Sequence, residues 1–534
     1  LKAGAERGAD SVVQVQGSAD ISAAYLSMKA TITSDLFGQS VVGGGGGLAA
    51  VGAQTNVTDD TTAAVRIENG AVLTSNAVVI AAQASRSLDG TANAKAFALG
   101  AGAGAGLDVE STGDALVQFY AATGTGAGAL RTVVMGQLIQ ISTLNTTQKQ
   151  YIVQQGGNTK NVESGSISLA SISAVVSQSD IGTSSNATSS VVDLGNASLI
   201  GVGSYASAAS ITLRSLTNIA ANDGVSVSAI SGALGAAVAT SNVHINSDTN
   251  VKMSGASITN ISGEVLMESR ATLRNGSDAG IFQTGAFGAL MGVSSESVTN
   301  SATNIDLANT SVLAKTLNIN AGSGGYIDNS LSSISAANGS LISAGVGLGV
   351  AFTKNEANLA SVINITGTTN LRSGGNMALN TTRGLLIQKH DGLVIVLAYV
   401  PYGYSVSNIG SNSIAANVKI ASTAKLEAGV NYQTLYQVAY APESGLTVAA
   451  GVTERALTTA EKTSLGLEAA QDYIVSVWDS SNLAMDLLYG DIVQLESANA
   501  ATAKGVAGNY YKFIGNPSGS TLSVILSKAD YTDR

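Results

Sequence analysis

A short apolar triplet that recurs at a nearly constant spacing constrains the fold of this chain more than any other feature. Counted from Leu194, the last residues of successive copies lie 51, 62, 58 and 55 residues apart. A unit of this size cannot bury its apolar face alone, so neighbouring copies must stack. The copies are Val65–Ile67, a partial copy at Val192–Leu194, then Val243–Ile245, Ile305–Leu307, Val362–Ile365 and Val418–Ile420.

A second element, rich in Ala, Gly and Val and poor in charge, lies between the triplets. Both elements alternate apolar with small or polar residues, which is typical of half-buried strands, and helical spacing is nearly absent. The sequence therefore predicts an all-β chain folded as a parallel β-solenoid. We expect each repeat to hold two or three coils of about 18–25 residues, in a rod on the order of 70–90 Å long. The Ala/Gly segments are Gly43–Gly52, Ala98–Leu107, Gly232–Val238, Gly285–Val293 and Ala344–Val350.

The glycines of these segments suggest close packing, because a strand glycine usually marks a place where another backbone approaches. We expect a thin flank that packs against another sheet or another subunit. The alternative is that glycine only relieves crowding where the chain turns. The candidate packing residues are Gly102, Gly104, Gly106, Gly345, Gly347 and Gly349.

The repeat is interrupted between residues 111 and 190, which predicts an inserted β-rich module. Its Gly136–Ile141 segment resembles Gly490–Leu495 near the C-terminus. A capping-box pattern at Thr458–Glu461 predicts a helix, so the C-terminal part is either α+β or β. The predicted division is solenoid repeats over 1–110, the insert over 111–190, repeats over 191–430, and a C-terminal module related to the insert over 431–534.

Composition excludes several classes of protein. The net charge of −10 disfavours nucleic acid and anionic membranes as partners, and 45% hydrophobic residues exclude a disordered chain. No apolar run approaches the roughly 20 residues of a membrane-spanning helix. The absence of Cys removes disulfides and thiolate metal sites. Because residue 1 is Leu, we expect a piece of a longer chain.

No motif predicts catalysis or a cofactor. His244 alternates with apolar residues and is expected to face solvent, and His390 lies in a charged turn without a nucleophile placed beside it. A glycine run such as Gly100–Gly106 lacks the Lys and the helix of a phosphate-binding loop. Calcium is expected at most as an adventitious ion, at Asp59 with Asp60 or at Asp108 with Glu110. Acidic residues do not recur at matching repeat positions, so we expect no enzyme.

Low-complexity strings such as Ala344–Ala351, followed by an Asn-containing stretch and a Val-x-Ile strand, resemble the repeats of giant bacterial surface proteins. These are the filamentous-haemagglutinin-like and autotransporter-like adhesins with β-helical stalks. The blocks Gly490–Leu495, Tyr510–Gly515 and Lys528–Tyr531 are similar to a small module found among those repeats. The resemblance implies an extracellular, cell-surface location and a structural or adhesive role, and it supplies no catalytic residue.

The resulting expectation is a non-enzymatic segment of a bacterial fibre, sheath or adhesin stalk. Its expected partners are more of the same chain or identical subunits stacked end to end. The alternative is an adhesin that binds glycans or another cell surface through a Tyr-rich C-terminal module, although the same aromatic residues would also serve as a module core. The candidate contacts are Tyr399, Tyr402, Tyr404, Trp478, Tyr510 and Tyr511.

Overall fold

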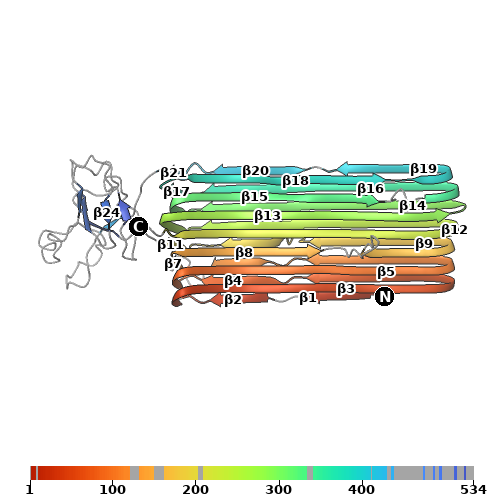
Figure 1. Ribbon diagram of the computed structural model, residues 1–534, viewed down its shortest axis with the longest axis horizontal. Helices are drawn as coiled ribbons and strands as arrows, with labels where there is room; N and C mark the ends of the chain where they lie inside the picture. Colours follow the sequence, from red (N-terminus) through yellow and green to blue (C-terminus); the bar gives the residue numbers. More distant parts are fainter. Residues whose placement is uncertain are drawn as a thin grey trace.

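The computed structural model describes residues 2–429, except 8–9, 18, 121–130, 150–160, 203–207, 333–340 and 411, together with six short strands between 435 and 524. Strands make up 87% of the described residues and no helix occurs among them, so the predicted all-β class is confirmed. Most strands belong to one large parallel sheet (Figure 1). Its 21 strands are β1 Lys2–Arg7, β2 Asp10–Val15, β3 Asp20–Asp59, β4 Thr62–Glu68, β5 Val72–Ser111, β6 Ala115–Tyr120, β7 Val133–Gly136, β8 Leu138–Lys149, β9 Val162–Ile181, β10 Thr188–Asp193, β11 Ser198–Gly201, β12 Ser210–Ser254, β13 Ser257–Gly285, β14 Gly288–Ala308, β15 Ser311–Ser332, β16 Leu341–Thr366, β17 Asn370–Ser373, β18 Met377–Leu393, β19 Val396–Ile409, β20 Ser413–Ile420 and β21 Lys425–Ala428.

Two small sheets form from the strands beyond residue 434. In the first, β25 is parallel to β23 and antiparallel to β26, which also pairs with β22. In the second, β24 and β27 are antiparallel. The helix predicted from Thr458 lies outside the described residues. The strands are β22 Leu435–Gln437, β23 Tyr473–Val475, β24 Met485–Leu487, β25 Ile492–Leu495, β26 Tyr510–Phe513 and β27 Leu522–Val524.

The register of the large sheet is set by the long repeat itself. Each strand pairs in parallel with the strand one repeat later, and we call each such turn of chain a level. The predicted coils of 18–25 residues are wrong, because partners lie one whole repeat apart, as Val13 and Val65 do. One column of paired residues through the levels is Val13, Val65, Val117, Val192, Val251, Ile305, Ile363 and Val418.

This column corrects two copies of the repeat. Val251 occupies the position expected for Val243. Val243 lies eight residues earlier on the same strand and pairs with Ser297. Val117 is a copy that the sequence analysis missed. Val-x-Ile triplets occur at more than one place in each level, so the pattern alone does not show which copies are equivalent.

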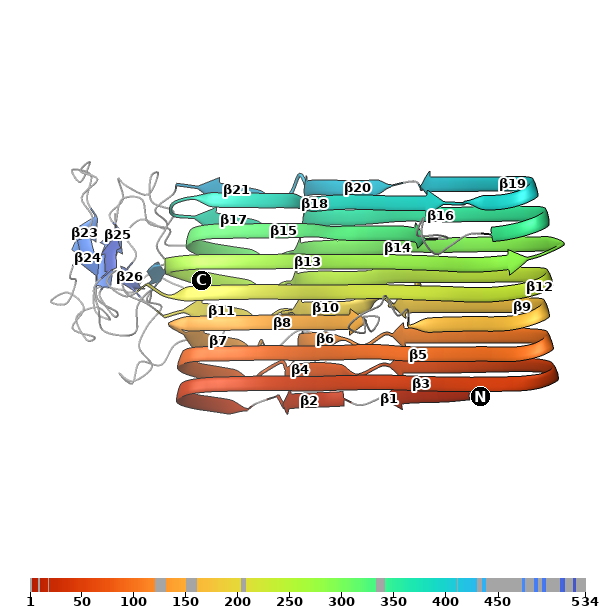
Figure 2. The ribbon, with the colours of Figure 1, turned by 45° about the vertical axis from the view of Figure 1, so that its right-hand side comes forward.

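The long axis of the sheet lies along its strands, whereas the predicted rod was elongated along the stack (Figures 1 and 2). Strands reach 45 residues in β12 and 40 in β3 and β5, where short ones were expected. Burial alternates along β12 even where hydropathy falls, because inward positions there carry Ser, Thr and Asn. A strand whose inward residues are polar has no apolar alternation, so its continuity was not visible in the sequence.

One corner is marked by residues with positive φ. Gly195, Gly255 and Gly367 have φ of 49°, 74° and 64°, and Asn309 replaces glycine on the intervening level with φ of 51°. Glycine and asparagine are the residues that adopt this left-handed conformation at low cost. The turn at Asn69–Gly70 forms the same corner lower in the stack, with φ of 99° at Gly70. The corner therefore fixes where each level begins its next strand.

The interior has three zones. Near this corner it is filled by Ile, Leu, Val and Met, such as Ile141, Met267 and Ile305, and we call this the aliphatic end. Near the opposite turn the interior is rich in Ala, with Ala94 and Ala96 in the same cluster as Ala101, Ala103 and Ala105, and we call this the alanine end. Between them lies a polar band of buried Ser, Thr, Asn and ion pairs. The predicted thin flank corresponds to the alanine end.

The described strands of the expected insert are strands of the large sheet. β6 pairs with β4 and β10, and β8 and β9 each pair with β5 below and β12 above. Residues 115–120, 133–149 and 162–181 therefore complete a level rather than form a separate module. Leu138–Ile141 pairs only in parallel, whereas the similar Ile492–Leu495 has an antiparallel partner. The boundaries of the other three segments stay a prediction.

Candidate functional site

The outer surface just after the turn of the alanine end is apolar, which is unusual for the solvent side of a sheet. We call it the apolar face and number its seven rows by level. Large side chains stand out from it, with Leu48 exposed by 86%, Ile172 by 67% and Leu234 by 59%. The rows begin at Leu48, Gly100, Ala170, Leu234, Gly288, Val346 and Val400, which are paired one to the next.

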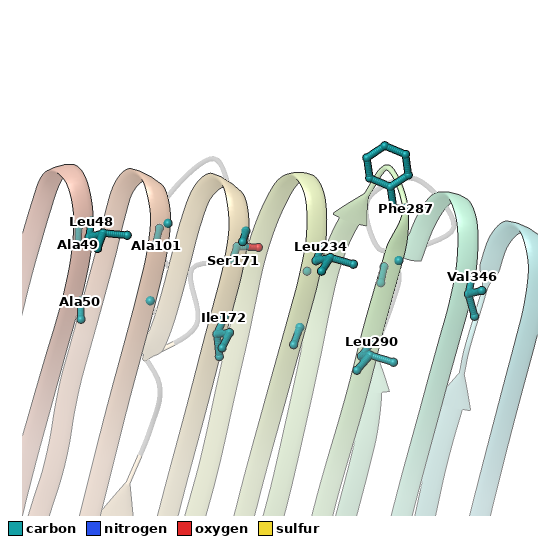
Figure 3. Close-up of a pocket in the computed structure, with 17 residues that line it drawn as sticks. Leu48, Ala49, Ala50, Ala101, Ser171, Ile172, Leu234, Phe287, Leu290 and Val346 are labelled. Atoms are coloured by element: carbon teal, nitrogen blue, oxygen red, sulfur yellow. The ribbon is translucent and has the colours of Figure 1, made fainter.

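These side chains border a groove of about 1020 Å³ across the rows. Figure 3 shows Leu48, Ile172, Leu234, Leu290 and Val346 on neighbouring strands of this face, with the strand of Ala101 between those of Leu48 and Ile172. Every fully described outward position from residue 48 to 54 and its equivalents on the other rows is uncharged. The groove is therefore a site for an apolar surface rather than for an ion.

Glycine shapes this face in two ways. A Cβ at Gly100 would lie 2.9 Å from Leu48 Cδ2, and a Cβ at Gly288 would lie 3.2 Å from Leu234 Cδ2. In these two places a leucine of one level lies over the glycine of the next. At Gly104 and Gly292 a Cβ would meet nothing within 4 Å, so crowding does not require glycine there. The expectation that glycine only relieves crowding thus fits Gly100 but not Gly104.

The six candidate packing glycines fall into two groups. Gly102, Gly104 and Gly106 face outward in row 2, where they leave a furrow between rows of larger side chains. Gly347 and Gly349 face inward, and a Cβ there would come within 2.5–2.8 Å of Leu341 and Val394. Gly345 lies against the Phe287 carbonyl. The two Gly-rich strings have opposite phase, so only the first set lies on the apolar face.

The candidate tyrosines do not gather at one place. Tyr402 and Tyr404 lie on β19 in row 7 of the apolar face, exposed by 59% and 50%, and Tyr404 packs edge-on against Phe352 at 6.4 Å. Tyr510 lies on β26, and Tyr511 beside it is buried. Trp478 lies outside the described residues. The exposed tyrosines thus belong to the large sheet.

Further along the strands, the apolar face is bordered by charged and amide groups that follow one another from level to level. We call this line of groups, which runs across the strands, the bordering row or ion-pair row. His244 Nδ1 lies 2.9 Å from Asp180 Oδ1, and Lys354 Nζ lies 2.8 Å from Glu296 and 3.0 Å from Glu356. The hydrogen bond to Asp180 raises the pKa of His244. Burial alone would raise the pKa of Asp180, but hydrogen bonds from His244 and Gln178 outweigh it and lower that pKa. His244 faces outward as expected, within an ion-pair network.

Asparagines continue this row from level to level. Asn300 Nδ2 donates to Asn246 Oδ1 at 2.8 Å, and Asn358 Nδ2 donates to Asn300 Oδ1 at 2.8 Å. Asn246 in turn donates to the Gly182 carbonyl, and Asn358 Oδ1 accepts from the Ser413 backbone. This ladder ties five levels together side by side.

The polar band holds two fully buried ion pairs that the sequence analysis did not predict. Lys149 Nζ lies 2.8 Å from Asp223 Oδ1, and Asp223 also accepts from Asn161, Ser177 and Ser179. Arg86 Nε lies 3.3 Å from Asp59 Oδ1. The signal available in the sequence was a basic residue at an inward position of an alternating strand, as Arg86 is in β5 and Lys149 at the end of β8.

The buried Arg86 side chain explains why an amide stands at Asn145 and a glycine at Gly113. The Arg86 guanidinium donates to Asn145 and to the Thr61 carbonyl, and a Cβ at Gly113 would overlap it. Burial lowers the pKa of Arg86, partly offset by Asp59. Asp59 is thus occupied by an arginine, which disfavours the calcium site considered there. No cluster of three His, Cys, Asp or Glu suited to a metal occurs among the residues that the structure describes.

No family model, curated protein or solved structure matches this chain. In the described part of the chain, no helix is both long and apolar enough to cross a membrane.

Proposed function

We propose that the large sheet is a β-solenoid and that the chain is a structural, non-enzymatic segment of an extracellular bacterial fibre, sheath or adhesin stalk. The observation that carries this proposal is the unbroken parallel register of column Val13 to Val418. Stacked in this way, the strands satisfy one another's backbone groups along the whole length of the stack. Further copies of the chain stacked at the ends would extend the same ladder.

The polar side chains that join the levels support a mechanical role. The asparagine ladder and the buried ion pairs join one level to the next by side chains, in addition to the backbone ladder. Separating two levels therefore breaks both kinds of bond together. Catalytic chemistry, by contrast, would need convergent reactive groups in one cleft, and the groove described above is apolar.

Single-molecule pulling on the purified chain tests this role. A solenoid should peel level by level, with each step releasing about 190 Å of contour for a level of about 54 residues. Imaging of the native material by cryo-electron microscopy should show fibres or stalks on the cell surface, with a coil spacing near 4.8 Å. One cooperative rupture of the whole sheet, or a location inside the cell, would contradict the proposal.

A second candidate function is glycan or surface binding, favoured by the exposed Tyr399, Tyr402 and Tyr404 on β19. Exposed aromatic rings stack on sugars. We expect Tyr402→Ala with Tyr404→Ala to abolish binding on a glycan array while Tyr25→Ala, an exposed tyrosine elsewhere, leaves it unchanged. Equal binding by all three proteins, or none by the wild type, would remove this candidate.

A further inference from the structure

The apolar face has the size of a protein interface. Seven rows spaced about 4.8 Å apart cover about 30 Å, and four outward residues in each row cover about 23 Å. The resulting area of about 700 Å² is close to the roughly 800 Å² that each partner buries in a stable complex. An apolar patch of this extent on a solvated sheet indicates an interaction surface.

The face is also complementary to itself. A two-fold axis that lies in the face along row 4 places row 1 against row 7, row 2 against row 6 and row 3 against row 5. Row 2 is the glycine furrow, and every outward residue of row 6 has a large side chain. The facing pairs would be Gly100 with Val346, Gly102 with Leu348, Gly104 with Val350 and Gly106 with Phe352.

Rows 1 and 7 pair small with large side chains at two positions, whereas rows 3 and 5 pair small with small and large with large. In rows 1 and 7, Ala50 and Gly52 would face Tyr402 and Tyr404. In rows 3 and 5, Ala174 would face Gly292 and the larger Ile172 would meet Leu290. Row 4 would meet its own copy, with Val238 against Val238. A symmetric contact of this kind uses the same patch on both subunits.

From this geometry we propose that two copies of the chain pair through the apolar face, related by a two-fold axis along row 4. Uncharged rows let both copies bury the face without leaving an unpaired charge. In the bordering row, carboxylates such as Asp108, Asp180 and Glu296 outnumber the basic side chains, which disfavours an anionic membrane as the occupant. The pairing is lateral, so it does not depend on the proposed fibre role or on stacking at the ends.

Sedimentation of the full chain tests the pairing. The wild type should sediment as a dimer of the 53.2 kDa chain, and Val238→Lys should weaken the dimer at least ten-fold because two ammonium groups would meet on the axis. Asn218→Lys is the matched control, since Asn218 is exposed on the same strand but on the opposite outer surface. A monomeric wild type, or a Val238→Lys protein that pairs as well as the control, would overturn the proposal.

Size exchange tests the orientation. Gly104→Val should weaken the dimer by crowding Val350 of the other copy, and Val350→Gly should weaken it by leaving a gap. The double variant should recover most of the lost affinity, because the two changes compensate across the axis. Since a Cβ at Gly104 meets nothing within 4 Å in its own chain, folding should be unaffected, as circular dichroism would verify. Additive losses in the double variant would overturn this pairing.

Cross-linking provides a readout that does not depend on affinity. The chain has no cysteine, so Val238→Cys should be joined to itself by a short bis-maleimide, and Asn218→Cys should not. Equal cross-linking of both variants would contradict the axis along row 4. Flotation of monomeric chain with neutral phosphatidylcholine vesicles would overturn the proposal by making lipid the occupant.

Discussion

The two ends of the large sheet solve the same packing problem in opposite ways. At the aliphatic end the interior is filled by large side chains such as Ile141 and Ile305, and the outer surface carries charged residues such as Asp193 and Lys252. At the alanine end the interior is thin, and large apolar side chains such as Leu48 and Ile172 are outside. The comparison teaches that a sheet with small inward residues moves its apolar surface outward, where a partner can cover it.

The polar band separates the two ends, and breaking it should have the largest effect. Asp223→Ala leaves the Lys149 ammonium buried without its carboxylate and removes an acceptor from three other side chains. We expect a loss of about 3–5 kcal/mol in the free energy of unfolding, measured by urea denaturation. The double variant Lys149→Met with Asp223→Leu should lose less than Asp223→Ala alone, and a larger loss would show that charge pairing is not the cause.

A cavity at the aliphatic end should cost nearly as much. Ile305→Ala removes a fully buried side chain from the column through the levels, for an expected loss of about 2–5 kcal/mol. Denaturation by urea measures it. Val298→Ala on the same strand, at a position that faces outward, is the control and should cost under about 1 kcal/mol. Equal losses would mean that the interior of this end is not closely packed.

At the alanine end, by contrast, a larger inward side chain should lower the stability of the fold. Ala103→Leu places three extra carbons in an interior that is filled mainly by alanines, so we expect a loss of about 1–3 kcal/mol from overpacking. Thermal unfolding monitored by circular dichroism measures it, with Gly104→Ala, which points outward into open space, as the control. No change in stability on Ala103→Leu would show that the interior of this end has room for larger side chains.

The smallest expected effect concerns the ion-pair row beside the apolar face. Because the pKa of His244 is raised in the folded chain, its stabilising contribution is present below the unfolded value near 6.5 and is lost as pH rises through the folded pKa. The lowered pKa of Asp180 limits the contribution at acid pH, where it is lost as pH falls through that pKa. His244→Gln should therefore cost under about 1 kcal/mol near pH 5.5 and nothing near pH 9, as urea denaturation at both values would show. A loss independent of pH would contradict the ion pair as its cause.

The fold class could be predicted from the sequence because apolar alternation identifies strands, and the repeat length fixes which strands pair. The size of each level could not be predicted, since the Ser, Thr and Asn of the polar band interrupt the hydropathy of a continuous strand. Triplets such as Val243–Ile245 lie out of phase with Val192–Leu194, so equivalent copies required the pairing itself.

The candidate site was predicted in part. Gly102, Gly104 and Gly106 were identified as packing residues from their alternation alone. Whether such a glycine faces outward or inward depends on strand phase, which differs at Gly347 by one residue. The buried pair of Lys149 and Asp223 could not be predicted, because the two residues are 74 positions apart and meet only through the stacking of levels.

The buried ion pairs also give the lower levels a fixed order. Arg86 requires Asp59 from the level below it, and Lys149 requires Asp223 from the level above it. In the upper levels the same zone is joined by hydroxyl pairs such as Thr303 with Ser361, which are chemically interchangeable. Recombination that deletes or duplicates one of these lower levels would strand a fully buried charge, whereas the ion pair of Arg372 with Glu427 in the upper levels is partly exposed. The chain can therefore gain or lose length during evolution mainly in its upper levels, while its lower levels are inherited as one block.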